Sequence, residues 1–306
     1  MAELALSVIV VTFNRVSALQ RTLAALERQT LPREQFEVLV VNDGSTDRTE
    51  GFLRDYAEHA PSNFTLRMFH QSTAGPAKAR NHALRQANGS VVLFLGDDVI
   101  PTPELLEEHM EWHRKQPDGQ IAVLGLTTWD PMRRITPFMR WMERSGPQYR
   151  FWAIDDPDNA GYECFYGSNV SVKREFILTN GMFDEEFPPS TYEDMEAAYR
   201  MEQAGMRLVY NARAVGHHDH YTTLESAIRR MRRLGRAHRM YLRKTGQRIP
   251  RPAFTWGPQS VAADVKYRAF HAVGRLAQRY KALPGVYSYL LEKALMDGMK
   301  DRKALR

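Results

Sequence analysis

The sequence has few or none of the features that mark disulfide-rich, membrane-spanning, secreted or repeat proteins. It contains one cysteine, Cys164, which excludes an internal disulfide and is typical of a reducing compartment. No uninterrupted apolar run approaches the length that spans a bilayer, and the start Met1-Ala2-Glu3 lacks the basic residues and cleavage site of a signal peptide. No repeat or low-complexity segment occurs. With 306 residues, 43% of them hydrophobic, we expect a soluble, cytoplasmic globular protein with a sizeable core.

Charge is distributed unevenly along the chain. Residues 221–306 hold 20 Lys and Arg against 5 Asp and Glu, a balance of +15, whereas residues 1–220 have a balance of −9. We therefore expect a domain at 1–220 and a basic helical extension at 221–306. A solvated helix face is the ordinary explanation for such an extension. The density of its arginines, however, favours contact with an anionic membrane surface or acceptor. The acidic body and the lack of a recognisable motif argue against nucleic acid.

Buried-strand patterns alternate with helical spacing along most of the chain. Strands are expected at about 6–12, 36–42, 64–70, 90–96, 121–126 and 206–211. Helices are expected between them, at 192–203, from 222 onwards, and at about 261–280 and 286–300 after a break at Pro250 to Pro258. This alternation predicts an α/β fold with a mostly parallel sheet flanked by helices.

The segment 127–162 is less regular and is rich in Pro, Trp and Met. Long irregular segments inside a domain are usually functional or mobile. Trp129, Trp141 and Trp152 could form a stacking platform for a sugar, although buried aromatic residues are commoner than such platforms.

Two adjacent carboxylates, Asp97 and Asp98, follow the apolar strand pattern at 90–96. Ligands of open α/β sheets bind beyond the carboxyl ends of the strands, so these residues lie at the expected functional edge. Unpaired buried charge is costly, and a divalent cation with oxygen ligands would neutralise the pair. A metal-bound phosphate is one interpretation, and a solvated turn before Pro101 is the other.

Further candidates lie in the second half of the chain. Glu193 and Asp194 begin a helix, where acidic residues also complement the helix dipole without any catalytic role. The run His217-His218-Asp219-His220 follows a strand and supplies either metal ligands or a polar surface turn. Its histidines are too closely spaced for all three to bind one structural zinc ion.

Several of these stretches occur in the order seen in one enzyme family. Residues 7–15, 38–47, 75–81 and 94–98 resemble successive strand and turn motifs of family 2 inverting glycosyltransferases, and 167–169 and 192–194 resemble the acceptor-side motifs. The resemblance covers about residues 5 to 235 and implies a GT-A type, Rossmann-like fold. It also implies transfer of a sugar from a nucleoside diphosphate donor, with UDP expected, to a hydroxyl of a glycan or lipid-linked acceptor.

The resemblance implies a role for each matching residue. Donor-nucleotide residues would be Thr12, Phe13, Arg15, Asp43, Arg80 and Asp97. Asp98 would ligate Mg²⁺ or Mn²⁺, with Asp97 as the alternative, and His218 or else His220 would complete the site. Asp194 would be the general base, with Glu193 as neighbour or substitute. The acceptor side would comprise Gly167, Ser168, Asn169, Trp129 and Trp152.

One residue departs from the family pattern. Gly96 stands where many relatives have a carboxylate, so two carboxylates remain rather than three. A non-catalytic protein of this fold that binds nucleotide or glycan is the alternative function. Against it, an inactive copy should have lost a site carboxylate, and this chain keeps all four candidates, Asp43, Asp97, Asp98 and Asp194.

Overall fold

The computed structural model divides the chain into two units. It describes residues 4–59, 64–117, 119–145, 147–247, 261–278 and 283–301. The first unit, here called the sheet unit, comprises residues 1–130 and 154–220. The second, the helical unit, comprises residues 131–153 and 221–306. The irregular segment therefore contributes to both units, and most of it groups with the basic C-terminal residues.

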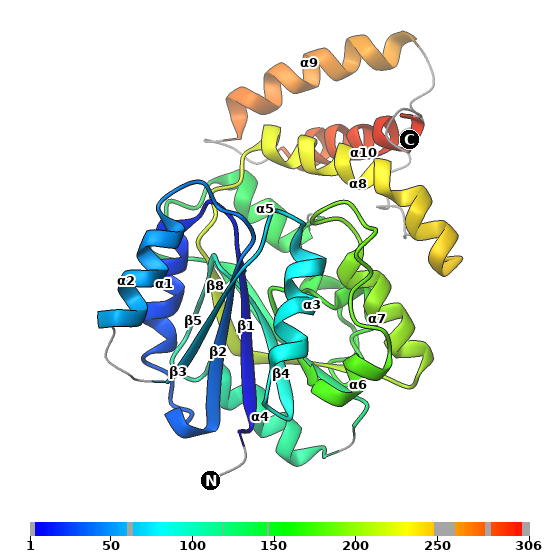
Figure 1. The fold of residues 1–306 in the computed structure, drawn as a ribbon. Coiled ribbons are helices and arrows are strands. Elements are labelled where there is room, and N and C mark those ends of the chain that lie inside the picture. The colour runs from blue at the N-terminus through cyan, green and yellow to red at the C-terminus, as the bar shows by residue number, and fades with distance from the viewer. Residues whose placement is uncertain are drawn as a thin grey trace. The chain divides into compact units, whose positions relative to one another are not determined.

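The sheet unit contains an eight-stranded mixed sheet with the order β3-β2-β1-β4-β7-β6-β8-β5 (Figure 1). The strands are β1 Leu6–Thr12, β2 Phe36–Asn42, β3 Thr65–His70, β4 Val91–Gly96, β5 Val99–Pro101, β6 Ile121–Trp129, β7 Asn169–Lys173 and β8 Arg207–His218. Four of the seven pairings are parallel, including those of β1 with β2 and β4. β7 runs antiparallel to both β4 and β6. The α/β prediction is confirmed, with more antiparallel pairing than the strand patterns alone suggested.

Helices flank this sheet and follow its strands (Figure 1). They are α1 Val16–Leu26, α2 Thr49–His59, α3 Pro76–Gln86, α4 Leu105–Lys115, α6 Arg174–Thr179 and α7 Glu193–Gln203, with short 3₁₀ turns at Arg33–Gln35 and Tyr162–Cys164. Val8, Val38 and Leu93 are fully buried in the core that the strands and helices share. This burial accounts for the continuous apolar runs, because strands covered on both faces need apolar residues at every position.

The last strand of the sheet is longer than its apolar pattern predicts. β8 continues from Arg207 through His218, whereas the sequence predicts that it ends at 211, with the histidine run beyond it as metal ligands or a surface turn. The extension exists because His218 pairs with both Val99 of β5 and Trp129 of β6. An irregularity in the pairing at Gly125/Leu126 accompanies it. Consequently His218 has a fixed backbone instead of lying on a surface turn.

The helical unit contains α5 Pro137–Ser145, a 3₁₀ turn at Phe151–Ala153, α8 Leu224–Thr245, α9 Val261–Ala277 and α10 Pro284–Lys300. The predicted apolar stripe of α8 is buried at Ile228, Met231, Leu234 and Tyr241. Gly235 of α8 and Gly298 of α10 allow close backbone approach, since a Cβ atom on either would collide with the other helix. The predicted break at Pro250 to Pro258 lies outside the described residues. None of the described helices is long and apolar enough to cross a bilayer.

Candidate active site

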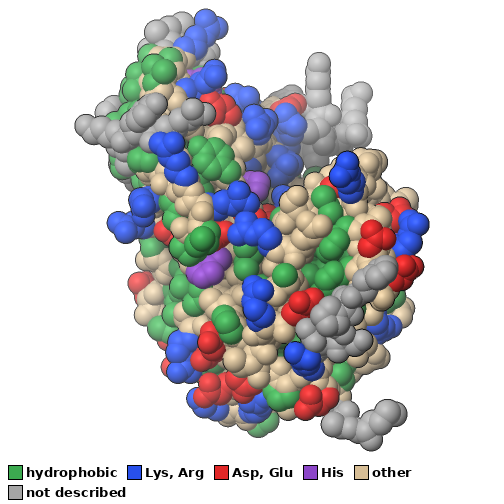
Figure 2. Space-filling model, turned by 90° about the vertical axis from the view of Figure 1, so that its left-hand side faces the viewer, with side chains coloured by type: hydrophobic (Ala, Val, Ile, Leu, Met, Phe, Trp, Pro, Cys, Tyr) green, Lys and Arg blue, Asp and Glu red, His purple; other side chains and the backbone are tan. Residues whose placement is uncertain are grey.

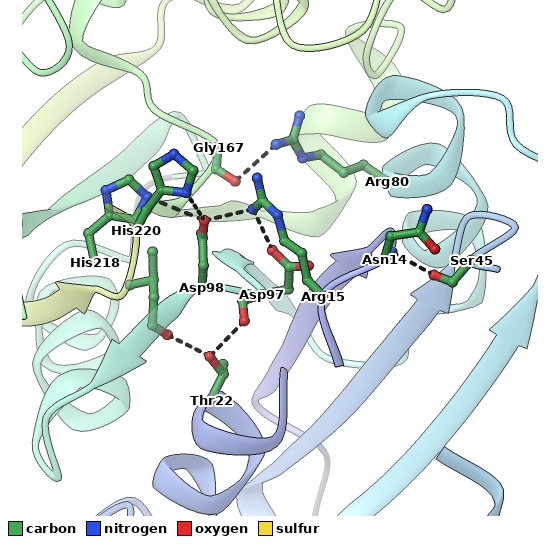
Figure 3. Close-up of polar contacts among 11 residues, drawn as sticks. Asn14, Arg15, Thr22, Ser45, Arg80, Asp97, Asp98, Gly167, His218 and His220 are labelled. Atoms are coloured by element: carbon green, nitrogen blue, oxygen red, sulfur yellow. Dashed lines mark hydrogen bonds and ion pairs between the residues drawn. The ribbon is translucent and has the colours of Figure 1, made fainter. Parts of the chain in front are cut away.

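An arginine and two aspartates meet where β1 and β4 end. β1 and β4 are parallel neighbours, so the residues that follow them emerge at the same edge of the sheet. Arg15, just beyond β1, places its Nη1 atom 3.1 Å from Oδ1 of Asp97 and 2.6 Å from Oδ2 of Asp98 (Figure 3). Both carboxylates are buried, and Arg15 is their cationic partner. The predicted functional edge therefore holds a buried, charge-paired carboxylate cluster.

Two histidines approach Asp98 from the end of β8. Nε2 of His218 lies 3.4 Å and Nδ1 of His220 lies 3.8 Å from Oδ2 of Asp98 (Figure 3). The imidazole rings of His218 and His220 stack with centroids 5.5 Å apart, and the Trp129 ring stacks on His218 at 5.4 Å. Trp129 is buried, so in this arrangement it supports the histidine. Thus the structure brings both candidate histidines to the same carboxylate.

The two neighbouring aspartates differ in proton affinity. Burial and the adjacent charge of Asp98 raise the pKa of Asp97. Burial alone would raise the pKa of Asp98 as well, but His218, Arg15 and His220 outweigh it and hold that pKa well below its usual range. Asp98 is therefore the carboxylate that stays ionised most readily, which suits a cation ligand.

The donor set around Asp98 determines which cation would fit. Among the described residues, no group of three or more His, Cys, Asp or Glu side chains is arranged as a ready-made metal site. A carboxylate with imidazole nitrogens nearby fits a divalent cation that takes its remaining ligands from a diphosphate and water, as Mg²⁺ commonly does. The residues fit such a shared site and do not form a closed protein cage.

Asp43 follows β2 and is held by the loop that leads into α3. Its Oδ1 accepts hydrogen bonds from Nε2 of Gln71 at 2.8 Å and the backbone N–H of Ala74 at 2.9 Å. Its Oδ2 accepts from the N–H of Gly75 at 2.9 Å. The positive φ of Gly75, +92°, is a conformation that glycine adopts readily, so the turn can direct its amides at the carboxylate. Asp43 therefore has a fixed orientation next to the end of β1.

A second charged centre forms at the first turn of α7. Nη1 of Arg80 lies 2.7 Å from Oδ1 of Asp194, and the backbone N–H of Gly167 donates to Oδ2 of Asp194 at 2.9 Å. Arg80 also donates to the carbonyl of Gly167 at 3.2 Å (Figure 3). Glu193 turns inward: its Oε2 accepts from Thr191 N, and burial together with Asp194 raises its pKa. Asp194, with 27% of its side chain exposed against 4% for Glu193, is the more accessible carboxylate.

Backbone contacts join the two centres. The N–H of Gly96 donates to the carbonyl of Ser168 at 3.0 Å, so the end of β4 lies against the segment that binds Asp194. Space at Gly96 is limited: a Cβ atom there would lie 3.0 Å from Val99 Cγ2 and 3.1 Å from Oδ1 of Asp98. A side chain at position 96 would therefore crowd the cluster.

The other predicted site residues have different surroundings. Thr12 is buried at the end of β1, whereas Phe13 is 45% exposed beside it. Asn169 is fully buried, and its amide donates to the carbonyls of Leu126 and Ala214. Its side chain therefore links β7 to β6 and β8. Trp152 belongs to the helical unit and is 52% exposed. Ser168 is half-buried between the two charged centres.

A three-residue ion-pair cluster that the sequence did not predict lies beside the histidines. Nη1 of Arg21 in α1 lies 2.5 Å from Oδ2 of Asp219, and its Nη2 also pairs with Asp130. Asp130 directly follows Trp129, and Asp219 directly follows His218. Arg21 therefore joins the ends of β6 and β8, which carry the stacked Trp129 and His218. The sequence predicts that these strands end at 126 and 211, so neither carboxylate adjoins a predicted strand end and no sequence signal marks the cluster.

The chain is similar to known proteins over most of its length. The family model described as Glycosyl transferase family 2 matches residues 7–170. Validoxylamine A glucosyltransferase of Streptomyces hygroscopicus subsp. jinggangensis is 27% identical over 233 residues, which cover 69% of this chain and 54% of that relative. The match thus spans little more than half the relative's length.

Two solved structures show the same fold. Mannosyltransferase PcManGT from Pyrobaculum calidifontis, in complex with GDP-Man and Mn²⁺, has a TM-score of 0.65 and 21% sequence identity, covering 95% of this chain and 86% of that one. S. aureus TarS 1–349 in complex with UDP has a TM-score of 0.58 and 18% identity, covering 97% and 89%. The sheet and its helices are therefore of the GT-A glycosyltransferase type.

Proposed function

The chain belongs to glycosyl transferase family 2, and we propose that it is a metal-dependent inverting glycosyltransferase. It would move a sugar from a nucleoside diphosphate donor to a hydroxyl of a glycan or lipid-linked acceptor. The observation that carries this proposal is the proximity of two centres: the Asp97–Asp98 cluster and the Arg80–Asp194 pair, joined through Gly96 and Ser168. One suits a diphosphate and the other an acceptor hydroxyl.

The proposed donor is a UDP sugar. The carboxylate of Asp43 is fixed by the loop amides, and it would accept a hydrogen bond from the ring N–H of uracil. Guanine also has such a ring N–H donor, and adenine lacks it. One solved neighbour holds UDP and another holds GDP-Man, so both bases belong in the test. Thr12, Phe13 and Arg15 lie beside this position on the end of β1 and would complete the nucleotide site.

Asp98 and His218 are the residues that would hold Mg²⁺ or Mn²⁺, with Asp97 and His220 as the alternates. When bound, the cation would neutralise negative charge on the departing diphosphate. Arg15 contributes a permanent positive charge at the same carboxylates, and Arg80 brings a second guanidinium to the acceptor side. The leaving group would thus depart beside the bound cation and Arg15.

Asp194 would act as the general base. Arg80 and the Gly167 N–H each take one of its oxygens, which orients the carboxylate and leaves lone pairs for the acceptor O–H. Inversion in one displacement needs one such base and no covalent nucleophile. Glu193 is less suited because burial favours its protonated form.

We also propose where the enzyme works. The helical unit carries 25 Lys and Arg against 6 Asp and Glu, which suits a cytoplasmic protein that lies peripherally on the inner, anionic face of a membrane. A lipid-linked acceptor would be presented at such a surface. Ser168 and Trp152, which retain solvent exposure, are the acceptor-side candidates most open to a ligand.

Donor binding provides a direct test. Thermal shift with UDP, GDP and dTDP sugars, each with and without Mn²⁺, should show stabilisation by UDP sugars that Mn²⁺ increases and that Asp98→Ala loses. Release of UDP should follow when a matching acceptor is added. Metal-dependent UDP binding without turnover on any acceptor would instead favour the non-catalytic binding protein. Absence of nucleotide binding would contradict the transferase and would leave glycan binding as the alternative.

A further inference from the structure

One side of α9 packs inside the helical unit. Gly274 faces α8 and α10, where a Cβ atom would lie 2.8 Å from Leu224 and 3.3 Å from Leu290. The Phe270 ring meets Tyr289 of α10 edge-on at 5.4 Å. Tyr267, one turn earlier on the same side, lies 5.3 Å from Nζ of Lys293. These contacts account for the apolar residues on the inner side of α9.

The opposite side of α9 is apolar as well. Ala269, Ala272, Val273 and Leu276 are all exposed, including 48% of Val273 and 76% of Leu276. Their spacing of three, one and three residues places them on one stripe that spans roughly 100° of the helix. We call these four residues the outer stripe. A helix packed on only one side needs no apolar residues here, so the outer stripe calls for another explanation.

Positive charge lies along one edge of the outer stripe. Arg268 and Arg275 are exposed along its border, although Nε of Arg275 also pairs with Glu225 at 2.8 Å. Residues 265–291 include five Lys and Arg and no Asp or Glu. On the face shown in Figure 2, the described part of the helical unit displays green hydrophobic and blue basic side chains with few red acidic ones. An exposed apolar stripe with basic residues along its edge is the pattern of a helix that lies in a lipid interface.

We propose that α9 is an interfacial anchor whose outer stripe inserts into an anionic lipid bilayer. Leu276 and Val273 would enter the acyl boundary, and Arg268 would remain at the phosphate level, where a long basic side chain can extend from a buried stem. A second copy of this helix is a poorer partner because its own basic border would face like charges. Nucleic acid would use the charge but not the apolar stripe. This inference does not depend on the proposed transfer reaction.

Vesicle co-sedimentation of the full chain tests the anchor. Wild type should pellet with vesicles of phosphatidylcholine containing roughly a third phosphatidylglycerol, and much less with phosphatidylcholine alone. Val273→Gln/Leu276→Gln, which changes no charge, should bind about tenfold or more weakly because two apolar side chains no longer leave water. Leu276→Trp should bind more tightly, since tryptophan favours the interface.

A matched control separates the outer stripe from general surface hydrophobicity. Met132 belongs to the same unit and is 87% exposed, so Met132→Gln removes an exposed apolar side chain outside α9 and should bind like wild type. Circular dichroism melts would show that each variant is folded. Wild-type binding by the double glutamine variant, or equal binding to both kinds of vesicle, would overturn the proposal. So would self-association that the double variant abolishes, without vesicle binding, because a second copy would then cover the outer stripe.

Discussion

Nη1 of Arg15 lies 2.6 Å from Oδ2 of Asp98, the carboxylate that we propose as the metal ligand. A divalent cation bound to this oxygen must compete with the guanidinium for it. We therefore expect Arg15→Gln to bind Mn²⁺ about tenfold more tightly than wild type in the absence of nucleotide, as measured by titration calorimetry. Arg67→Gln is the control. It removes an arginine whose Nη1 lies 3.2 Å from Oε2 of Glu37, a residue of β2, and it should leave Mn²⁺ affinity unchanged. Weaker Mn²⁺ binding by Arg15→Gln would show that Arg15 supports the cation site.

The carboxylates at the start of α7 should contribute unequally to turnover. Asp194→Asn keeps the shape of the side chain but removes its basicity, so turnover should fall by about 10²–10⁴-fold while UDP affinity is retained. Glu193→Gln should have a much smaller effect, because Glu193 is buried and oriented by Thr191. Steady-state kinetics together with UDP titration separate the two effects. Near-normal turnover of Asp194→Asn would exclude Asp194 as the base.

The ion-pair cluster at Arg21 should act on the metal site through the strand ends. Arg21→Gln removes one ion pair from Asp130 and one from Asp219, the residues that directly follow the stacked Trp129 and His218. We expect Mn²⁺-dependent UDP binding to weaken about tenfold while metal-free UDP binding is unchanged, with partial recovery in Arg21→Lys. Arg54→Gln, which removes an exposed arginine 3.8 Å from Glu50, is the control for loss of charge. Equal weakening with and without metal would indicate a general loss of structure.

Much of the sheet unit was predictable because its strands are buried on both faces. Runs such as 6–12 and 36–42 are apolar at almost every position, which sets them apart from the intervening helices. Asp97 and Asp98 were recognisable as candidates because two carboxylates end such a run. Their individual roles, and those of Asp43 and Asp194, stay predictions.

Other features depend on pairing between distant segments, and the hydrophobic periodicity of the sequence does not predict such pairing. The extension of β8 to His218 relies on partners in β5 and β6, and polar residues such as Asn211 and Arg213 interrupt its apolar pattern. The Arg21 cluster joins three segments more than 85 residues apart in the chain. The burial of Asn169 follows from carbonyls on β6 and β8. Such contacts become visible only once the strands are placed in order.

Two buried histidines should make folding stability depend on pH. Burial lowers the pKa of His109 to about 4 and that of His113 to about 3, from 6.5. Between these values and 6.5 the unfolded chain binds more protons than the folded chain, so stability is fully present above pH 6.5 and is lost as the pH falls toward 4. At about pH 4 the loss should reach about 3 kcal/mol per histidine. Denaturant unfolding across this window measures it.

Variants of the same buried network isolate the histidine contribution. His109→Gln and His113→Gln should each flatten the pH dependence, and the double variant should flatten it most. Ser171→Ala is the control, since it removes the hydroxyl that lies 2.8 Å from Nδ1 of His109 and 2.9 Å from Nε2 of His113 but keeps both imidazoles. It should lower stability and retain the steep dependence. An unchanged slope in the double histidine variant would contradict this account.

Gly167 offers a way to disturb the proposed base without changing its chemistry. A Cβ atom at Gly167 would lie 2.8 Å from Oδ2 of Asp194, closer than side-chain atoms normally approach, so Gly167→Ala should push the carboxylate away from its position between Arg80 and the Gly167 N–H. Turnover should fall about 10²-fold, because small displacements of a catalytic group are costly, while UDP binding persists. Gly51→Ala is the matched control, since a Cβ atom at Gly51 meets nothing within 4 Å. If both alanine variants keep wild-type turnover, the position of Asp194 does not limit the reaction, and the base must be sought elsewhere.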